Sequence, residues 1–385
     1  MDPLLERCGD LKQELVAFAT SDRFDAALQE LIFDEFPDGV IDDELSFALT
    51  LDGFIHGHRL AAGTSLIESF INSRPDLSAA DRAIVCSWLE NVQGTFEIVE
   101  MAGDDGFVAF NHVDELTYRM RSNMGAAGVS ALSPGMIVIG RIVPVSDFWM
   151  ISGPMASFPA DQAEDLLAGV PQLQASHPEA VFRNPEKLEQ GRRMQTEQRA
   201  DFIAVHGSDT VVVPGAQVRE VLMAAYRHTY ERHGSVDGPW TEPDFPLPEA
   251  WTDADSVGII YDELDGLGFY IDYTVLIELF TDPALLTRRR YRETLSGYLR
   301  DDEVSPVPIA RLAADDPDNA SRLFAKLLKK PGFSWDRDGE AVLRRNKKHW
   351  YDNPPLPRIV PVDSRVATRV RSTPPKARRR RLIHG

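Results

Sequence analysis

The sequence predicts an α+β protein with a helical N-terminal region, a small five-stranded antiparallel β-barrel, and a C-terminal α+β unit with a disordered basic tail. Three observations predict this fold class. Apolar residues recur with a period of about 3.6 through residues 1–91 and with a period of 2 through residues 92–160. Charge is divided along the chain, with a net +13 in residues 322–385 and a net −32 in the first 321 residues. At 385 residues and 43% hydrophobic content, the chain is long enough for two or three globular domains.

Helical spacing of apolar residues marks the N-terminal region. Leu11, Leu15 and Phe18 share one helical face. Ser78 begins a later helix as its N-cap, with Asp81 at the capping-box position, and that helix extends to about residue 91. This last helix places Trp88 in the core and predicts that Cys86 is a buried, inert thiol on the same side.

Five short β-rich runs with turn residues between them predict the barrel at residues 92–160. In the third run, apolar Leu116, Tyr118 and Met120 alternate with polar residues, so that one face is apolar. Such a succession of short strands is typical of a barrel of OB or SH3-like type, with residues 123–135 as a long connecting loop. The five runs are Thr95–Met101, Gly106–Val113, Leu116–Ser122, Met136–Val145 and Phe148–Phe158.

Residues 161–235 predict helices and one hairpin. In that hairpin, residues 202–205 would pair with residues 210–213 across a turn at Gly207-Ser208-Asp209. The proline and glycine content of residues 236–250 predicts a linker between this part and the next.

Residues 251–352 predict a second α+β unit. A hairpin is expected within residues 257–272, and Asp-Pro pairs at residues 282–283 and 316–317 begin two helices. Residues 353–385 are predicted as the basic tail. Residues 360–385 have few larger apolar groups and are expected to be disordered.

The composition predicts a soluble, cytoplasmic protein without a cofactor. No signal peptide is recognised at the N-terminus, and no stretch has the ~20 apolar residues that span a bilayer, so membrane insertion is not expected. Cys8 and Cys86 are the only cysteines, which excludes a disulfide framework and a four-cysteine zinc site.

Two groups of side chains are candidates for chemistry. His56 and His58 are close enough in sequence to share a metal, but no third or fourth ligand is identifiable, which favours structural histidines. Asp262, Glu263, Asp265 and Asp272 gather around the second hairpin, where paired carboxylates hold Mg²⁺ or act as acid and base in other proteins. In a chain with 60 acidic residues, a solvated turn is the simpler interpretation. No motif for a nucleophilic serine, a phosphate loop or a zinc protease occurs, so we predict no catalytic residue.

The barrel also has residues that nucleic-acid-binding barrels use, namely arginines beside aromatic rings. However, residues 91–160 hold seven acidic residues against three arginines, which opposes phosphate binding. The residues considered are Arg119, Arg121, Arg141, Tyr118, Phe148 and Trp149.

The basic C-terminal region is the candidate polyanion-binding site. Its charge either contacts the acidic part of the chain or binds nucleic acid or another polyanion. The candidate residues are Lys326, Lys329, Lys330, Arg344, Arg345, Lys347, Lys348, Arg378, Arg379, Arg380 and Arg381.

Several sequence blocks resemble a known group of proteins. They are Phe54, Gly63-Thr64-Ser65-Leu66, Leu77-Ser78, Trp88-Leu89, Phe96-Glu97-Ile98-Val99, Leu132-Ser133-Pro134-Gly135, and Trp149 with Gly153. This pattern resembles the body of uncharacterised bacterial proteins that often carry a SEC-C zinc motif. Further blocks resemble an actinobacterial branch of that group, namely Val205-His206-Gly207-Ser208-Asp209, Gly266-Leu267-Gly268-Phe269-Tyr270 and Tyr298-Leu299-Arg300-Asp301-Asp302. The resemblance covers about residues 45–350.

The chain departs from this pattern at the zinc motif, because it lacks the cysteine cluster that the motif requires. Zinc binding is therefore not implied, and the group implies no activity. We predict a non-enzymatic cytoplasmic interaction or adaptor protein that binds a protein partner. The alternatives are a nucleic-acid-associated protein acting through residues 322–385 and an enzyme of unrecognised class.

Overall fold

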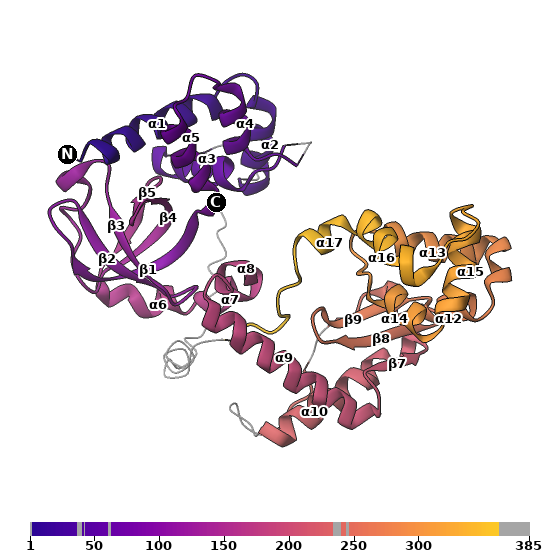
Figure 1. Ribbon diagram of the computed structural model, residues 1–385. Coiled ribbons are helices and arrows are strands. Elements are labelled where there is room, and N and C mark those ends of the chain that lie inside the picture. Colours follow the sequence, from indigo (N-terminus) through magenta and orange to yellow (C-terminus); the bar gives the residue numbers. More distant parts are fainter. Residues whose placement is uncertain are drawn as a thin grey trace, which may run out of the picture. The chain divides into compact units, whose positions relative to one another are not determined.

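The computed structural model describes residues 2–36, 41, 43–60, 63–233, 240–243 and 246–361. These fold into two compact units, which divide between Asn184 and Pro185 (Figure 1). The α+β fold class is confirmed, with a helical N-terminal region followed by a small barrel and then a second α+β part. The predicted disorder of residues 360–385 concerns mostly residues outside the described part, because the description ends at Pro361.

The first unit begins with helices whose starts are fixed by local caps. Asp2, Asp43, Ser65 and Ser78 each accept a backbone N–H of the first helical turn, as N-cap side chains do. At Ser65, Glu68 completes a capping box. The helices are α1 (Pro3–Ala19), α2 (Asp25–Glu35), α3 (Glu44–Gly57), α4 (Leu66–Ser73) and α5 (Ala79–Ser87), with a 3₁₀ turn η1 (Trp88–Glu90).

The helix before the barrel confirms one expectation and corrects another. Trp88 is 0% exposed in the helical core, as predicted. Cys86 is exposed and the other cysteine, Cys8, is buried, so the prediction of a buried Cys86 was wrong. Val85 and Trp88, three residues apart, face the core, and Cys86 between them points away from it.

Five strands close into a barrel in the order β1-β2-β3-β5-β4, and β4 pairs back to β1. They are β1 (Val92–Met101), β2 (Gly106–Asn111), β3 (Thr117–Arg121), β4 (Ile137–Val145) and β5 (Phe148–Ile151), and a sixth strand, β6 (Ala156–Phe158), pairs with β4. The predicted run Phe148–Phe158 is therefore two strands with a break at residues 152–155. This strand order is that of an OB-type barrel, one of the two types expected.

The barrel is mixed and not purely antiparallel as predicted, because β3 and β5 pair in parallel. The other four closing pairs are antiparallel. Strand directions cannot alternate all the way round a closed ring with an odd number of strands. One parallel pair is thus a necessity of closing five strands.

The two sides of the barrel wall contact different cores. Val92, Phe96 and Phe107 belong to the cluster that fills the barrel. Val143 and Met150 instead pack with α1–α5, which lie against the barrel as one layer (Figure 1). Short helices then complete the unit: η2 (Gly125–Gly128), η3 (Ala160–Gln162), α6 (Ala163–Leu167), α7 (Val170–Ser176) and α8 (Pro178–Val181).

The second unit has a three-stranded antiparallel sheet in the order β7-β8-β9. Helices pack around it, with a core that includes Leu276, Leu295 and Phe324. Its elements are α9 (Pro185–His206), β7 (Thr210–Val213), η4 (Gly215–Gln217), α10 (Val218–His233), α11 (Glu249–Thr252), β8 (Val257–Asp262), β9 (Gly266–Ile271), α12 (Tyr273–Thr281), η5 (Pro283–Thr287), α13 (Arg289–Arg300), α14 (Val307–Asp315), α15 (Pro317–Leu327), α16 (Trp335–Asn346) and α17 (Lys348–Asp352).

The hairpin predicted at residues 202–213 was wrong, whereas the hairpin β8–β9 is present. Residues 202–205 continue α9, and the N–H of Gly207 still bonds to the carbonyl of Ile203 at 2.7 Å. Strand β7 pairs with β8, although residues 236–250, which were expected to link two separate parts of the chain, lie between the two strands in the sequence. A helix already formed by the preceding residues overrides the weak strand preference of four residues.

No helix within the described ranges is long and apolar enough to cross a membrane.

Candidate functional site

A cavity of about 350 Å³ opens in the first unit between α1, α3 and the segment that follows β5. The residues from each helix are spaced three or four apart, so each helix gives one face to the cavity. Most of the walls are apolar or small, and polar groups gather at the floor. The lining residues are Gly9, Lys12, Gln13, Val16, Ala17, Ala48, Leu51, Asp52, Ile55, Asn123, Ser152, Gly153 and Pro154.

The floor is a buried polar network centred on Lys12. Its ammonium group contacts Asp52 Oδ1 at 3.1 Å, His56 Nε2 at 3.1 Å and Ser152 Oγ at 2.7 Å. Ser152 Oγ donates to Asp52 Oδ1 at 2.7 Å, and Arg141 Nε donates to Asp52 Oδ2 at 2.9 Å. The three N–H groups of Lys12 thus meet three acceptors, which is what a buried ammonium requires.

Backbone geometry brings Ser152 to this network. Ser152 and Gly153 lie at the break between β5 and β6. A Cβ atom at Gly153 would approach the carboxyl carbon of Asp52 to 3.1 Å, so glycine allows this segment to pass close to α3.

Burial sets the protonation of the network. It lowers the pKa of His56 to about 3, helped by the positive charge of Lys12, so the imidazole is neutral at pH 7. Burial alone would raise the pKa of Asp52, but Lys12, His56, Arg141 and the Ser152 hydroxyl together lower it to about 2. Burial also lowers the pKa of Lys12, and the ion pair with Asp52 opposes this effect.

The network does not have the geometry of a Ser-His-Asp triad. In a triad the serine and the carboxylate contact different ring nitrogens of the histidine. Here the contacts of His56 with Ser152 Oγ at 3.0 Å and with Asp52 Oδ1 at 3.7 Å both involve Nε2. Lys12 is engaged with Asp52 as an ammonium group, so it is not a free base for Ser152. The arrangement supports binding better than nucleophilic catalysis.

The neutral state of His56 predicts a loss of stability in acid. The unfolded state, with a histidine pKa of about 6.5, binds more protons than the folded state between that pH and about 3. Stability therefore falls as the pH is lowered through this window. We expect Tm, measured by circular dichroism from pH 7 to 4, to fall less steeply for His56→Gln than for the wild type. His58→Gln is the control with an unchanged slope, and parallel curves for His56→Gln and wild type would contradict the prediction.

The two predicted histidines serve different roles. His56 is part of the buried network, and His58 follows α3 with its ring 4.8 Å from that of Phe54. Among the residues that the structure describes, no group of three or more histidine, cysteine or acidic side chains is placed to hold a metal ion.

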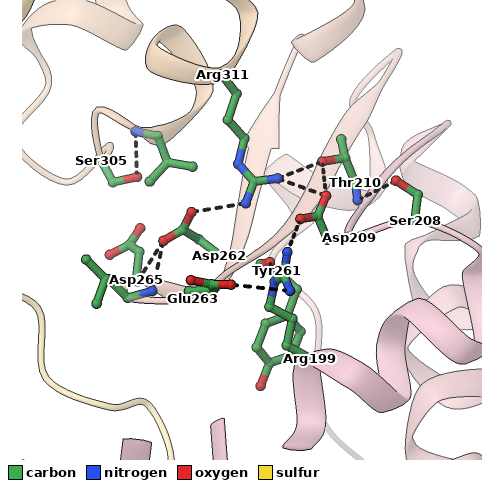
Figure 2. Close-up of polar contacts among 12 residues, drawn as sticks. Arg199, Ser208, Asp209, Thr210, Tyr261, Asp262, Glu263, Asp265, Ser305 and Arg311 are labelled. Carbon is green, nitrogen blue, oxygen red and sulfur yellow. Dashed lines mark hydrogen bonds and ion pairs between the residues drawn. The ribbon is translucent and has the colours of Figure 1, made fainter. Parts of the chain in front are cut away.

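The predicted carboxylate group around the second hairpin is divided among arginines (Figure 2). Arg311 on α14 donates to Asp262 Oδ2 at 3.0 Å and to Asp209 Oδ1 at 2.9 Å. Arg199 on α9 donates to the other oxygen of Asp209 at 2.5 Å, and it lies 3.7 Å from exposed Glu263. The network thus joins α9, α14 and the sheet.

The remaining carboxylates of that group also have local partners. Asp262 Oδ1 accepts the backbone N–H groups of Leu264 and Asp265, which shapes the turn. Asp265 is buried beside Trp350, and Asp272 pairs with Arg290 at 3.1 Å. These contacts give the carboxylates structural roles. The turn is solvated, as expected, at Glu263, but Asp265 is buried and Asp262 is paired with Arg311.

The candidate aromatic rings of the barrel are mostly buried. Tyr118 is buried and its hydroxyl donates to Asp114 at 2.5 Å. Phe148 is buried beneath Arg121, which is paired with Asp2 and Asp105. Trp149 is partly buried, with its ring edge-to-face on Tyr118 at 5.1 Å. Of the three candidate rings, two are therefore withdrawn from the surface that stacking on a nucleic-acid base would need.

The basic candidates of the second unit differ in accessibility. Lys347 is 1% exposed and its ammonium donates to the carbonyl of Asp301, so its placement in a binding site was wrong. Lys330 pairs with Asp338, and Arg344 pairs with Glu340. Lys326, Lys329, Arg345 and Lys348 are exposed. Arg378, Arg379, Arg380 and Arg381 lie outside the described residues.

Comparison with known proteins bears on the first unit. Residues 8–180 are similar to a family of unknown function, DUF7986. This stretch contains all five residues of the network, from Lys12 to Ser152. No curated protein and no solved structure matches the chain. The resemblance to the SEC-C group stays a prediction.

Sequence analysis missed the network because its members are far apart in the chain. Lys12, Asp52, Arg141 and Ser152 come from three regions that only the fold brings together. A local signal existed, since Lys12 lies beside apolar Leu11 and Leu15 on α1, and Asp52 lies among apolar residues of α3. A charged residue within an apolar face indicates a buried partner.

Proposed function

We propose that this chain is a non-enzymatic cytoplasmic interaction protein, and that its first unit receives an apolar side chain of a protein partner. The half-open cavity between α1 and α3 is the observation that supports this most directly. Apolar walls over a few convergent polar groups are typical of binding sites in proteins. The polar groups at its floor are already paired with one another, so the cavity offers a ligand mainly its apolar walls.

The apolar lining continues outside the cavity, which favours a protein partner over a small molecule. Leu45 is 47% exposed and Leu49 is 39% exposed on α3. Leu45 is three residues from Ala48, and Leu49 is three residues from Asp52, so both lie next to cavity residues on the helix surface. A polypeptide with one side chain in the cavity would also cover these two leucines, whereas a molecule enclosed in the cavity would leave them in water.

The alternatives have less support. Catalysis by Ser152 lacks a free base, and two of the three candidate rings of the barrel, Tyr118 and Phe148, are buried. The polyanion alternative loses Lys347, and two of its other members are already paired with acidic residues.

Filling the cavity is the test of this proposal. The partner is first identified by affinity capture from the source cells, and it is then titrated with the purified full-length chain. We expect Ala48→Trp to weaken binding by about tenfold or more, because the indole occupies the space of the partner's side chain. Ala83→Trp, on the exposed side of α5, is the matched control and should bind like the wild type.

Two results would reject the proposal. One is a partner that binds the wild type and both tryptophan variants equally. The other is a small organic molecule, found by native mass spectrometry of the purified protein, that Ala48→Trp excludes.

A further inference from the structure

A second cavity of the first unit, of about 250 Å³, lies where β1 and β4 meet the helices α7 and α8. Its polar lining includes Asn91, Gln93, Arg141, His177, Glu179 and Arg183. The guanidinium group of Arg141 lines this cavity and also donates to Asp52 at the floor of the first cavity.

Besides the carboxylate of Asp52, neutral acceptors hold the two arginines of this cavity in place. Arg141 donates to the side-chain oxygen of Asn91, and it donates to Gln93 Oε1 at 2.8 Å. Arg183 donates to the main-chain carbonyls of Asn91 and Glu90, both at 2.9 Å. Both guanidinium groups therefore meet at Asn91. These bonds use only some of the five N–H groups of each arginine.

The buried network beside this cavity has an excess of positive charge. Lys12 and Arg141 share a single carboxylate, that of Asp52, and His56 is neutral, so the buried network keeps a net charge of +1. Arg141 carries part of this charge to the cavity, with 13% of its side chain exposed. A buried positive charge favours an anion beside it.

Arg183 brings a second guanidinium group to the cavity, near Tyr118 and Asp114. Among the described residues, no carboxylate lies within 4.0 Å of its guanidinium group. Burial raises the pKa of the Asp114 carboxyl, and the positive charge of Arg183 opposes this effect. That carboxyl group already accepts hydrogen bonds from the hydroxyl of Tyr118 and the N–H of Leu116. Glu179 contributes one negative charge to the exposed wall of the cavity, where its carboxylate lies 3.2 Å from the ring of His177.

We propose that the Arg141–Arg183 cavity binds a small oxyanion group, in the form of a phosphate, a sulfate or a carboxylate. Guanidinium groups bind such anions through pairs of parallel N–H bonds, and both forks here are held in position before a ligand arrives. Arg141 links this site to the network of the partner cavity, but Arg183 lines only this site and Ala48 only the other, so variants at these two residues test the two proposals independently.

Calorimetric titration of the full-length chain with inorganic phosphate tests this proposal, with chloride keeping the ionic strength constant. We expect saturable binding to one site that Arg183→Gln weakens about tenfold or more, because a charge-assisted pair of bonds is lost. Arg183→Lys, which keeps the charge without the fork, should give an intermediate affinity. Arg119→Gln, on the exposed face of β3, is the matched control and should bind like the wild type.

Sulfate and acetate titrations identify the source of the oxyanion. Tighter binding of phosphate and sulfate indicates a phosphate-type group, and tighter binding of acetate indicates a carboxylate. The proposal is overturned if none of the three anions binds saturably. It is also overturned if Arg183→Gln and Arg119→Gln weaken binding equally, since that would show only a general effect of net charge.

Discussion

Replacing Trp88 with alanine is expected to lower the free energy of unfolding of the first unit by about 3–5 kcal/mol. The indole is 0% exposed and packs in the core that joins α1–α5 to β4 and β5. Its removal loses the free energy gained by burying the indole. It also leaves a cavity that the surrounding core fills only in part. Urea denaturation followed by far-ultraviolet circular dichroism measures the change.

The neighbouring residue provides the control for this substitution. Leu89 is exposed, and Leu89→Ala should change the free energy of unfolding by no more than about 0.5 kcal/mol. Because the chain has two compact units, the transition that shifts with Trp88→Ala is assigned to the first. An unchanged midpoint for Trp88→Ala would show that this residue does not hold the helices to the barrel.

Replacing Asp52 with alanine is expected to destabilise the first unit by a similar amount, about 3–5 kcal/mol. Asp52 is the only carboxylate that contacts both Lys12 and Arg141 in the buried network. Without it, the two cations remain buried with no anion, which is far less favourable than burying a paired charge. Urea denaturation at pH 7 measures the loss. Asp10→Ala, at an exposed position of α1, should leave the free energy of unfolding almost unchanged.

The same network predicts an asymmetry between its partners. Lys12→Met should destabilise less than Asp52→Ala, because Arg141 still neutralises Asp52 when Lys12 is lost. Equal losses for Asp52→Ala and Lys12→Met would mean that Arg141 does not share the buried carboxylate as its 2.9 Å contact indicates.

Both effects bear on the proposed function. The network fixes α1 and α3 relative to the end of β5, and these three segments form the partner cavity. A variant that loosens the network would therefore change the cavity as well as the stability. For this reason Ala48→Trp, which touches no member of the network, is the sharper test of binding.

Local interactions explain what could be predicted from sequence. The helix capped by Ser78 depends on a hydrogen bond within one turn, and the hairpin β8–β9 depends on a connection of three residues, 263–265. Trp88 was predicted to be buried because it is a large apolar group on a helix with an apolar face. A solvated turn was predicted for the carboxylates of that hairpin because acidic residues are common in turns, and Asp262 does accept two N–H groups of the turn, although Asp265 is buried.

Long-range packing explains where the sequence alone was insufficient. Cys8 and Cys86 have the same intrinsic tendency to be buried, and only the placement of their helices makes one buried and the other exposed. In the sequence, Lys347 is one of several neighbouring basic residues. In the folded protein, its side chain is buried and its ammonium group donates to the carbonyl of Asp301. In both cases the environment of a side chain is set by elements distant in the chain.

The sequence by itself determined the fold class, the switch from helices to strands near residue 91, and the caps and turns at the ends of elements. These features depend on residues within a few positions of one another. The tertiary structure alone decided that β3 and β5 pair in parallel and that β7 joins the sheet of β8. It also decided that Lys12, Asp52, Arg141 and Ser152 meet, because contacts between residues up to 140 positions apart form only when the whole unit packs.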